Sequence, residues 1–361
     1  AEAALAHVFE TQVRAGSEAE AAIVVMSPDG AVRAMVGGRQ SDVPGGFNRA
    51  VQAMRQTGSA FKPFVYATAL DLGYKYNDMV NDAPLTINVP GSGPWSPQNY
   101  HEGEYLGLVT LTQALAKSLN TPAVRISEAV GRDRVIWVAT EFGIDSTLFN
   151  GPSLALGVSE TSLLELTSAY AGILAGGQKV RPYGLTELTL YGQSRPEMVH
   201  KTRKPERVIR TEAAEQLTYM MYQVIQSGTG VRAQLPGRQA AGKSGTTQSA
   251  RDAWFVGFTA DYVVGVWMGY DNNKPLTGVT GGGLPAEIWR ETMVRISDGV
   301  PASPLPMITP TDSAGRVVGD SGGAGSAGAE DEAPRRPQAP TPVEDLRSGV
   351  ERLLEGLFGR R

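Results

Sequence analysis

The sequence predicts an α/β fold of the α+β type, in which a five-stranded antiparallel sheet is flanked by helices. Two strand-like segments near the start of the chain are followed by a long block of helical patterns, and three more strand-like segments and a helix come after that block. Strands from both ends of such a chain can pair in one antiparallel sheet with helices on its faces. Hydrophobic residues form 41% of the 361 residues, which is enough for a sizeable core.

The first two predicted strands form a hairpin. Residues 21–26 are a short apolar run, and residues 31–36 form the returning strand. Between them, Pro28 presets the backbone for a tight turn and Gly30 permits a positive φ. Residues 1–20 are rich in Ala and Glu, and we expect them to form a linker helix from an upstream region that is missing from this sequence.

Helical spacing of apolar residues predicts several helices after the hairpin. One is marked by a capping box, since Ser162 and Glu165 have the S-x-x-E spacing. Another is predicted to begin at Pro122, because a proline at the first helical position leaves no hydrogen bond unmade. Further helices are predicted at residues 61–72, 111–119, 211–226 and 285–296. The three later strands are predicted at residues 241–246, 253–259 and 262–270.

The composition changes after the last predicted helix. Residues 313–342 are dominated by Gly, Ala, Ser, Pro and charged residues, with little apolar surface to offset the chain entropy, and we expect a disordered linker over residues 301–342. Residues 343–361 regain apolar residues at helical spacing and form a short amphipathic tail, which could dock on a partner or a membrane surface or stay disordered alone.

Composition also excludes several kinds of site. The net charge of −4, without a basic stripe, argues against a nucleic-acid partner. The absence of cysteine excludes disulfides, thiol nucleophiles and zinc–thiolate sites. Three histidines leave little material for a Ser-His-Asp triad or a multi-histidine metal site.

A first candidate motif is Ser59 with Lys62, at the start of the predicted helix 61–72. Residues three apart share a helix face, so the lysine amine lies within reach of the serine hydroxyl. A serine nucleophile needs a base, and a lysine with a pKa lowered by burial can serve. An N-terminal capping serine beside a solvated lysine is the alternative, although this S-x-x-K is the only one in the chain.

Two further motifs carry hydroxyl, amide and amine groups. Ser118 and Asn120 lie at a helix terminus and could relay a proton and bind a substrate amide, or simply cap the helix. Lys243, Ser244 and Thr246 alternate along a strand around Gly245, which lets a ligand backbone approach closely, so they could bind a carboxylate or form an ordinary edge strand.

Together these motifs resemble those of the transpeptidase domain of class A penicillin-binding proteins, a family within the penicillin-binding protein and β-lactamase fold of serine acyl-transferases. The resemblance covers about residues 21–296, within a single transpeptidase domain predicted at residues 21–300, and it extends to blocks outside the three motifs. These blocks are residues 31–38, 47–50, 154–159, 252–257 and 266–271.

The resemblance implies a D,D-transpeptidase mechanism that needs no metal and no cofactor. Ser59 would attack the penultimate D-Ala carbonyl of a peptidoglycan stem peptide, and Lys62 would take its proton. Ser118 would pass protons to the leaving amine, with Asn120 and Lys243 beside it. The carboxylate would lie on Ser244, Gly245 and Thr246, and the backbone N–H groups of Ser59 and Thr246 would form the oxyanion hole.

The resemblance also implies partners and a location. β-Lactams would trap Ser59, and the partners would include membrane-anchored cell-wall synthesis machinery on the periplasmic face of the bacterial inner membrane. The chain departs from β-lactamases at Leu119, where they have Asp, and from the commoner K-T-G at Ser244. A D,D-carboxypeptidase or β-lactamase, for which Glu160 and Glu165 are the candidate water-activating groups, and a non-catalytic β-lactam sensor are the alternatives.

One loop is left open. Trp95, Asn99 and Tyr100 lie in a Pro- and Gly-rich stretch before the second predicted helix, and they either line the cleft or pack the loop.

Overall fold

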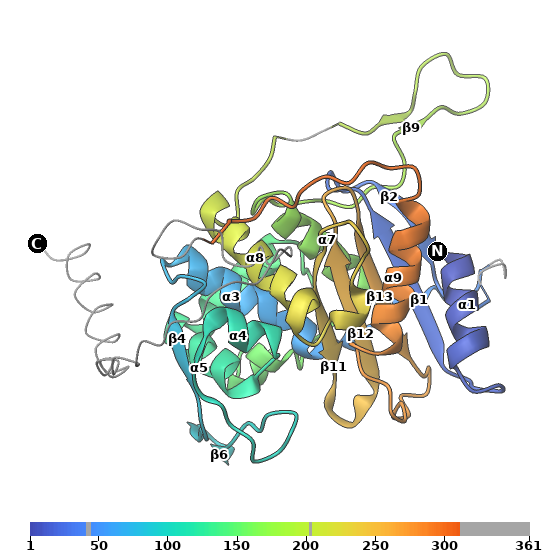
Figure 1. The fold of residues 1–361 in the computed structure, drawn as a ribbon. Helices are drawn as coiled ribbons and strands as arrows, with labels where there is room; N and C mark the ends of the chain where they lie inside the picture. The colour runs from blue at the N-terminus through green and yellow to red at the C-terminus, as the bar shows by residue number, and fades with distance from the viewer. Residues whose placement is uncertain (41–44, 202–203, 311–361) are drawn as a thin grey trace, which may run out of the picture. The chain divides into compact units, whose positions relative to one another are not determined.

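The computed structural model describes residues 1–40, 45–201 and 204–310, and it contains the predicted five-stranded antiparallel sheet (Figure 1). The spatial order of the strands is β11-β12-β13-β1-β2, so strands from the two ends of the chain pair at β1 and β13. The sequence-based fold class is therefore confirmed. The strands are β1 (Glu20–Met26), β2 (Val32–Val36), β11 (Ala241–Thr246), β12 (Asp252–Phe258) and β13 (Val263–Gly269).

Both faces of the sheet are buried. Side chains alternate along a strand, and in β1 the residues Ala22, Val24 and Met26 join one core while Ala21, Ile23 and Val25 join the other. This explains why the central strands are nearly continuous apolar runs instead of alternating apolar and polar residues.

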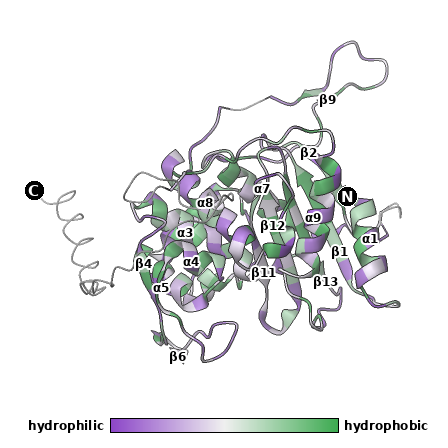
Figure 2. Ribbon diagram, in the orientation of Figure 1, coloured by the Kyte–Doolittle hydropathy of each residue, from purple (hydrophilic) through white to green (hydrophobic). Residues whose placement is uncertain are grey.

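Helices cover each face. α1 (Glu2–Gln12) and α9 (Leu284–Ile296) pack together on one face, and α7 (Leu163–Leu174) lies against β1 and β13 on the other (Figure 1). Figure 2 shows hydrophobic residues in both helical layers and in the strands between them. None of the helices in the described residues is long and apolar enough to cross a membrane.

The larger helical layer carries the candidate site. α3 (Lys62–Asp71) packs against α8 (Thr211–Ser227), α5 (Asn120–Val130) and α6 (Arg132–Glu141), while α4 (Leu111–Ala116) packs on α8. A small sheet of β4 (Met79–Asp82) and β7 (Gly107–Thr110) borders these helices. The other short elements are α2 (Arg49–Gln52), β3 (Arg55–Gln56), η1 (Gly58–Phe61), β5 (Ile87–Val89), β6 (Gly93–Trp95), η2 (Pro152–Leu156), β8 (Glu160–Thr161), β9 (Glu187–Leu188), β10 (Met198–Val199), η3 (Val231–Ala233) and η4 (Gln248–Ala250).

The observed helix boundaries test the capping-box and proline signals found in the sequence. The capping box of Ser162 and Glu165 at the start of α7 is confirmed in both directions. The helix predicted at 111–119 ends at Ala116, and the next begins at Asn120 instead of Pro122. The interruption between them comes from residue 118, whose backbone is left-handed and so cannot continue a right-handed helix.

The two ends of the described chain pack against the domain. In α1, the predicted linker helix, Leu5, Val8 and Phe9 are buried in the core cluster that α9 also joins. At the other end, Leu305 is 5% exposed and its N–H donates to the Gln239 side chain at 2.9 Å, so this part of the predicted linker packs against the domain. Residues 311–342 of that linker and the predicted tail 343–361 lie outside the described residues.

Candidate active site

Ser59 lies in η1, the single 3-10 turn that leads directly into α3. In a 3-10 turn the side chains at positions i and i+3 eclipse each other, which stacks Ser59 on the same side as Lys62. Ser59 is half-buried, and its hydroxyl makes no hydrogen bond within the part of the chain that the structure describes. The hydroxyl is thus free to bond to a ligand.

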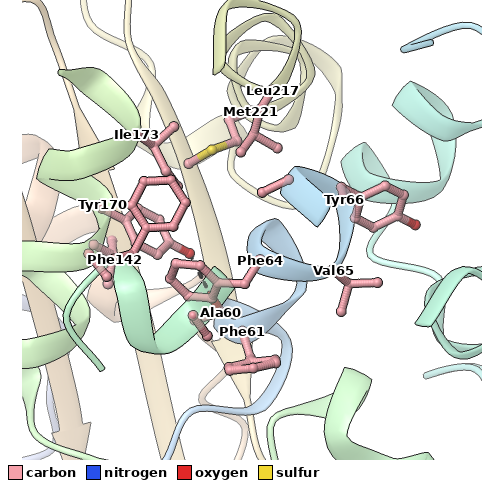
Figure 3. Close-up of a cluster of buried hydrophobic side chains, with 14 of the residues drawn as sticks. Ala60, Phe61, Phe64, Val65, Tyr66, Phe142, Tyr170, Ile173, Leu217 and Met221 are labelled. Atoms are coloured by element: carbon pink, nitrogen blue, oxygen red, sulfur yellow. Dashed lines mark hydrogen bonds between the residues drawn. The ribbon is translucent and has the colours of Figure 1, made fainter. Parts of the chain in front are cut away.

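A cluster of aromatic side chains packs against the turn that carries Ser59. Figure 3 shows Phe64 among the rings of Phe61, Phe142 and Tyr170, at centroid distances of 5.4 to 6.1 Å. The Tyr170 hydroxyl donates to the carbonyl of Ala60 at 2.7 Å. Because Ala60 follows Ser59 directly, this bond from α7 holds the nucleophile turn in place.

Lys62 is completely buried and holds Ser118 and Asn120 together. Its Nζ donates to Ser118 O at 2.6 Å and to Asn120 Oδ1 at 2.7 Å, and it lies 3.4 Å from Ser118 Oγ. Burial, above all, and the charge of Lys243 lower the pKa of Lys62 well below its ordinary value, while Asp82 acts in the opposite direction. A lowered pKa increases the fraction of the amine that is neutral, which is the form that can accept a proton.

Lys243 completes the cluster from the sheet. Its Nζ donates to Ser118 Oγ at 2.8 Å and to Ser244 O at 2.9 Å. Burial lowers the pKa of Lys243 from 10.5 to about 7. Ser118 therefore lies between two buried amines, and its hydroxyl can pass a proton between them.

Ser118 occupies a backbone position that normally favours glycine. Its φ is 58°, and the bonds from Leu119 N to Ala114 O and from Ser118 N to Leu115 O form a Schellman motif at the end of α4. A left-handed conformation costs a residue with a Cβ about 1 kcal/mol or more. Ser118 keeps this strained conformation, and its hydroxyl lies between two lysines. Backbone strain of this kind is expected where a side chain is needed for chemistry.

We predict that Ser118→Gly is more stable than Ser118→Ala by about 1 kcal/mol. Both variants lose the hydroxyl and its bond from Lys243, so their difference isolates the backbone strain. Urea unfolding of the two variants measures it, and an alanine variant at least as stable as the glycine variant would contradict the strain argument. Both variants should also be acylated by a penicillin far more slowly than the parent chain is.

The end of β11 offers hydrogen-bonding groups on the side of the site that the sheet forms. β11 is an edge strand, and Thr247 N–H donates to Asp252 O at 3.1 Å. Hydrogen-bonded and non-hydrogen-bonded pairs alternate along an antiparallel ladder, so the preceding amide, that of Thr246, faces the open edge. The Thr246 hydroxyl accepts from Gly281 N–H at 3.0 Å, which leaves its proton free to donate to a ligand.

Ser244 is 6% exposed and pairs with Thr229. The two hydroxyl oxygens are 2.7 Å apart, and Thr229 follows the end of α8. Gly245 lies directly against the nucleophile segment, since a Cβ there would be 2.4 Å from Thr57 O. The structure thus brings all eight predicted site residues to one region where η1, the start of α5 and β11 meet.

Gly58 also permits a close approach between the turn that carries Ser59 and the end of β11. Its φ is +54°, and a Cβ on it would lie 2.6 Å from Thr246 O. We predict that Gly58→Ala destabilises the protein by about 2–3 kcal/mol, because strain and a backbone clash combine. Gly91→Ala is the matched control, since Gly91 has φ +77° but nothing within 4 Å, and it should cost only about 1 kcal/mol. Equal losses in urea unfolding would argue against the clash.

The sequence analysis did not identify Asp82 or Thr229 as site residues, and it left the position of Asn99 open. Asp82, at the end of β4, is 0% exposed and acts electrostatically on Lys62. Thr229 was missed because the neighbouring Gly228 indicates only the end of a helix and gives no sign of a site. Asn99, 9% exposed, packs inward and accepts from Asn120 N–H at 2.8 Å, whereas Tyr100 is 75% exposed.

The carboxylate of Glu165 is occupied by structural bonds. It accepts from Ser146 Oγ at 2.6 Å, from Thr161 Oγ1 and from Ser162 N–H. All three bonds go to Oε2, and they anchor the start of α7. Glu160 is exposed in the short strand β8.

Comparison with known proteins identifies the family. A model described as the penicillin binding protein transpeptidase domain matches residues 21–294. Penicillin-binding protein 1A of Neisseria lactamica is 38% identical over 294 residues, which are 77% of this chain and 36% of that protein. Penicillin-binding protein 1A of Rickettsia typhi is 35% identical over 312 residues, which are 80% of this chain and 40% of that protein. The chain thus spans less than half the length of these curated relatives.

Comparison with solved structures supports the same family. PonA1 of Mycobacterium tuberculosis in complex with penicillin V aligns with a TM-score of 0.74 and 29% identity over 88% of this chain and 86% of that one. Penicillin-binding protein 1A of Haemophilus influenzae aligns with a TM-score of 0.73 and 28% identity over 80% of this chain and 49% of that one. Given the family match over most of its length, this chain belongs to the penicillin-binding protein transpeptidase family.

Proposed function

We propose that this chain is a serine D,D-transpeptidase that crosslinks peptidoglycan stem peptides and is trapped by β-lactams. The observation that carries the proposal is the hydrogen-bonded cluster of Lys62, Ser118 and Lys243 beside Ser59, on a helical turn that stacks the serine and its base. Family membership supports the reaction class, and the relative solved with penicillin V supports β-lactam binding.

Lys62 is the general base in this proposal. A neutral amine has two N–H donors and one lone pair, and its two shortest bonds go to Ser118 O and Asn120 Oδ1. The lone pair therefore remains for the proton of the Ser59 hydroxyl. A positioned base of this kind contributes about 10²–10⁴-fold to a rate.

The acylation step follows from these positions. Ser59 Oγ bonds to the carbonyl carbon of the penultimate D-Ala as its proton moves to Lys62. The N–H groups of Ser59 and Thr246 stabilise the oxyanion, and each such donor is worth about 3 kcal/mol. The C–N bond then breaks, and the leaving D-Ala nitrogen takes a proton from Ser118, which Lys243 replenishes through its 2.8 Å bond.

Deacylation uses an amine from a second strand. This amine attacks the Ser59 ester, its proton returns through the same lysines, and the new peptide bond releases Ser59. The substrate carboxylate lies along β11, where Ser244 and Thr246 offer hydroxyl protons and Gly245 allows backbone contact. Lys243 adds positive charge at this end of the site when it is protonated.

We also propose an extracytoplasmic location, at the periplasmic face of the inner membrane, together with cell-wall synthesis machinery. Both follow from the peptidoglycan substrate and from similarity to penicillin-binding protein 1A relatives. Hydrolysis of the acyl-enzyme is the alternative activity, and the capping-box bonds of Glu165 give that residue a structural role at the start of α7 instead.

Product analysis tests the proposal. The chain is incubated with a stem pentapeptide donor that ends in D-Ala-D-Ala and with an acceptor stem peptide that carries a free amine. We expect free D-Ala and a crosslinked dimer, both abolished by penicillin. Cleaved monomer without dimer would favour a carboxypeptidase instead, and rapid acylation by penicillin with no turnover of any stem peptide would favour a sensor.

A further inference from the structure

Asp82 is a fully buried carboxylate outside the three motifs. It is 0% exposed at the end of β4, and it forms no ion pair in residues 1–40, 45–201 and 204–310. Burying a carboxylate is costly unless hydrogen bonds compensate. Asp82 Oδ1 accepts from Asn99 Nδ2 at 2.8 Å and Thr121 Oγ1 at 2.6 Å, and Oδ2 accepts from Leu106 N–H at 2.9 Å.

These bonds set the orientation of the Asn99 side chain. An ionised carboxylate only accepts, so Asn99 must turn its NH₂ group toward Asp82. Its oxygen then faces the start of α5, where it accepts from Asn120 N–H at 2.8 Å and lies 3.5 Å from Thr121 N. The free amide groups at the beginning of α5 are thereby satisfied by a side chain that Asp82 orients.

The same network reaches Lys62. Asn120 Nδ2 donates to Gln98 O at 2.6 Å, next to Asn99 in the chain, and this bond turns Asn120 Oδ1 toward Lys62 Nζ at 2.7 Å. Asp82 also acts through its charge, because a negative group nearby favours the protonated lysine and raises the pKa of Lys62 against the effects of burial and Lys243.

We propose that Asp82 is a positioning residue for Lys62, and that it acts through the Asn99 carboxamide and the start of α5. The inference rests on the proposed function, in which Lys62 is the base. It assigns to β4 and the 98–106 loop the task of holding the acceptor that orients the amine lone pair.

The test is the pH profile of acylation by a fluorescent penicillin, measured for the parent chain and Asp82→Asn. The substitution removes the charge and puts an NH₂ group against a donor in either orientation of the amide, against Asn99 Nδ2 and the Thr121 hydroxyl or against Leu106 N–H. We expect the acylation rate constant to fall about 10- to 100-fold, since small misplacements of a reacting group have effects of this size. The acid limb should also move to lower pH, because the group that favours protonated Lys62 is gone.

A swapped pair separates orientation from mere stability. In the double variant Asp82→Asn with Asn99→Asp, the new amide donates to the new carboxylate, whose other oxygen can still accept from Asn120 N–H. The oxygen of the new amide can accept from Leu106 N–H, and the Thr121 hydroxyl can accept instead of donate. In the parent chain Asn99 Nδ2 also donates to Glu104 O at 3.1 Å, and the new carboxylate cannot replace that bond, so we expect part of the lost rate to return. Asp78→Asn is the matched control, since Asp78 accepts from Lys75 N–H at 2.8 Å, outside the network.

The outcomes distinguish this inference from the proposed function. A parent chain that penicillin does not acylate would overturn the proposed function and, with it, the role of Asp82. If the parent is acylated, a wild-type rate or an unmoved acid limb in Asp82→Asn, or no recovery in the swapped pair, would overturn the inference alone. If Asp82→Asn does not fold, Asn99→Ala decides, because it keeps the Asp82 charge: a slower rate without a downward shift of the limb supports the network, and a wild-type rate overturns it.

Discussion

Lys62→Met should reduce the rate constant of acylation by β-lactam about 10²–10⁴-fold, the range expected when a positioned general base is lost. The fold should survive, because replacing a completely buried amine by an apolar side chain of similar length removes a desolvation cost. Stopped-flow measurement with a fluorescent penicillin gives the rate constant, and urea unfolding gives the stability. A variant acylated at the parent rate would exclude Lys62 as the base.

Lys62→Arg separates the base from the positive charge. A guanidinium stays protonated at every accessible pH, so this variant should be as slow as Lys62→Met and should not recover at high pH. Lys117→Met is the matched control, because Lys117 is exposed and lies next to the site in the chain. The control should acylate normally.

Lys243→Met should change the pH dependence of acylation as well as its rate. The Lys243 charge is one cause of the lowered pKa of Lys62, so its removal raises that pKa. Neutral Lys62 is the active form, and acylation rises with pH through its pKa; the acid limb should therefore move to higher pH. The plateau should fall about 10²-fold, since the amine that hydrogen-bonds Ser118 Oγ is lost.

The profile of kinact/KI against pH measures both effects, with Lys274→Met as the control on an exposed loop. A limb that stays in place or moves to lower pH would show that the two lysine charges do not interact as the structure indicates. A plateau that does not fall would remove Lys243 from the proton path.

Local signals predicted most of the fold. The strand at 241–246 matches β11, and the capping box of Ser162 and Glu165 begins α7. Such features depend on a few neighbouring residues, which is why the sequence is informative about them. The site motifs could also be found, because the serine and lysine of the first motif share one helical turn.

Long-range features could not be predicted in the same way. The role of Asp82 depends on a loop that brings Asn99 across to the start of α5, and no local pattern specifies that contact. The left-handed backbone of Ser118 was hidden because glycine, the usual signal, is absent there. Leu305 falls within the predicted linker 301–342, yet it is buried in the core, a contact that no local pattern specifies.

The central claim is that the Ser59 hydroxyl, primed by a buried lysine, forms the acyl-enzyme. Peptide mapping after reaction with penicillin tests it most directly. Trypsin does not cleave the bond between Lys62 and Pro63, so the relevant peptide is residues 56–75, in which Ser59 is the only serine. The account predicts one penicilloyl group on that peptide, assigned to Ser59 by fragmentation. An adduct on Ser118, Ser244 or any other residue, or no adduct at all, would contradict it.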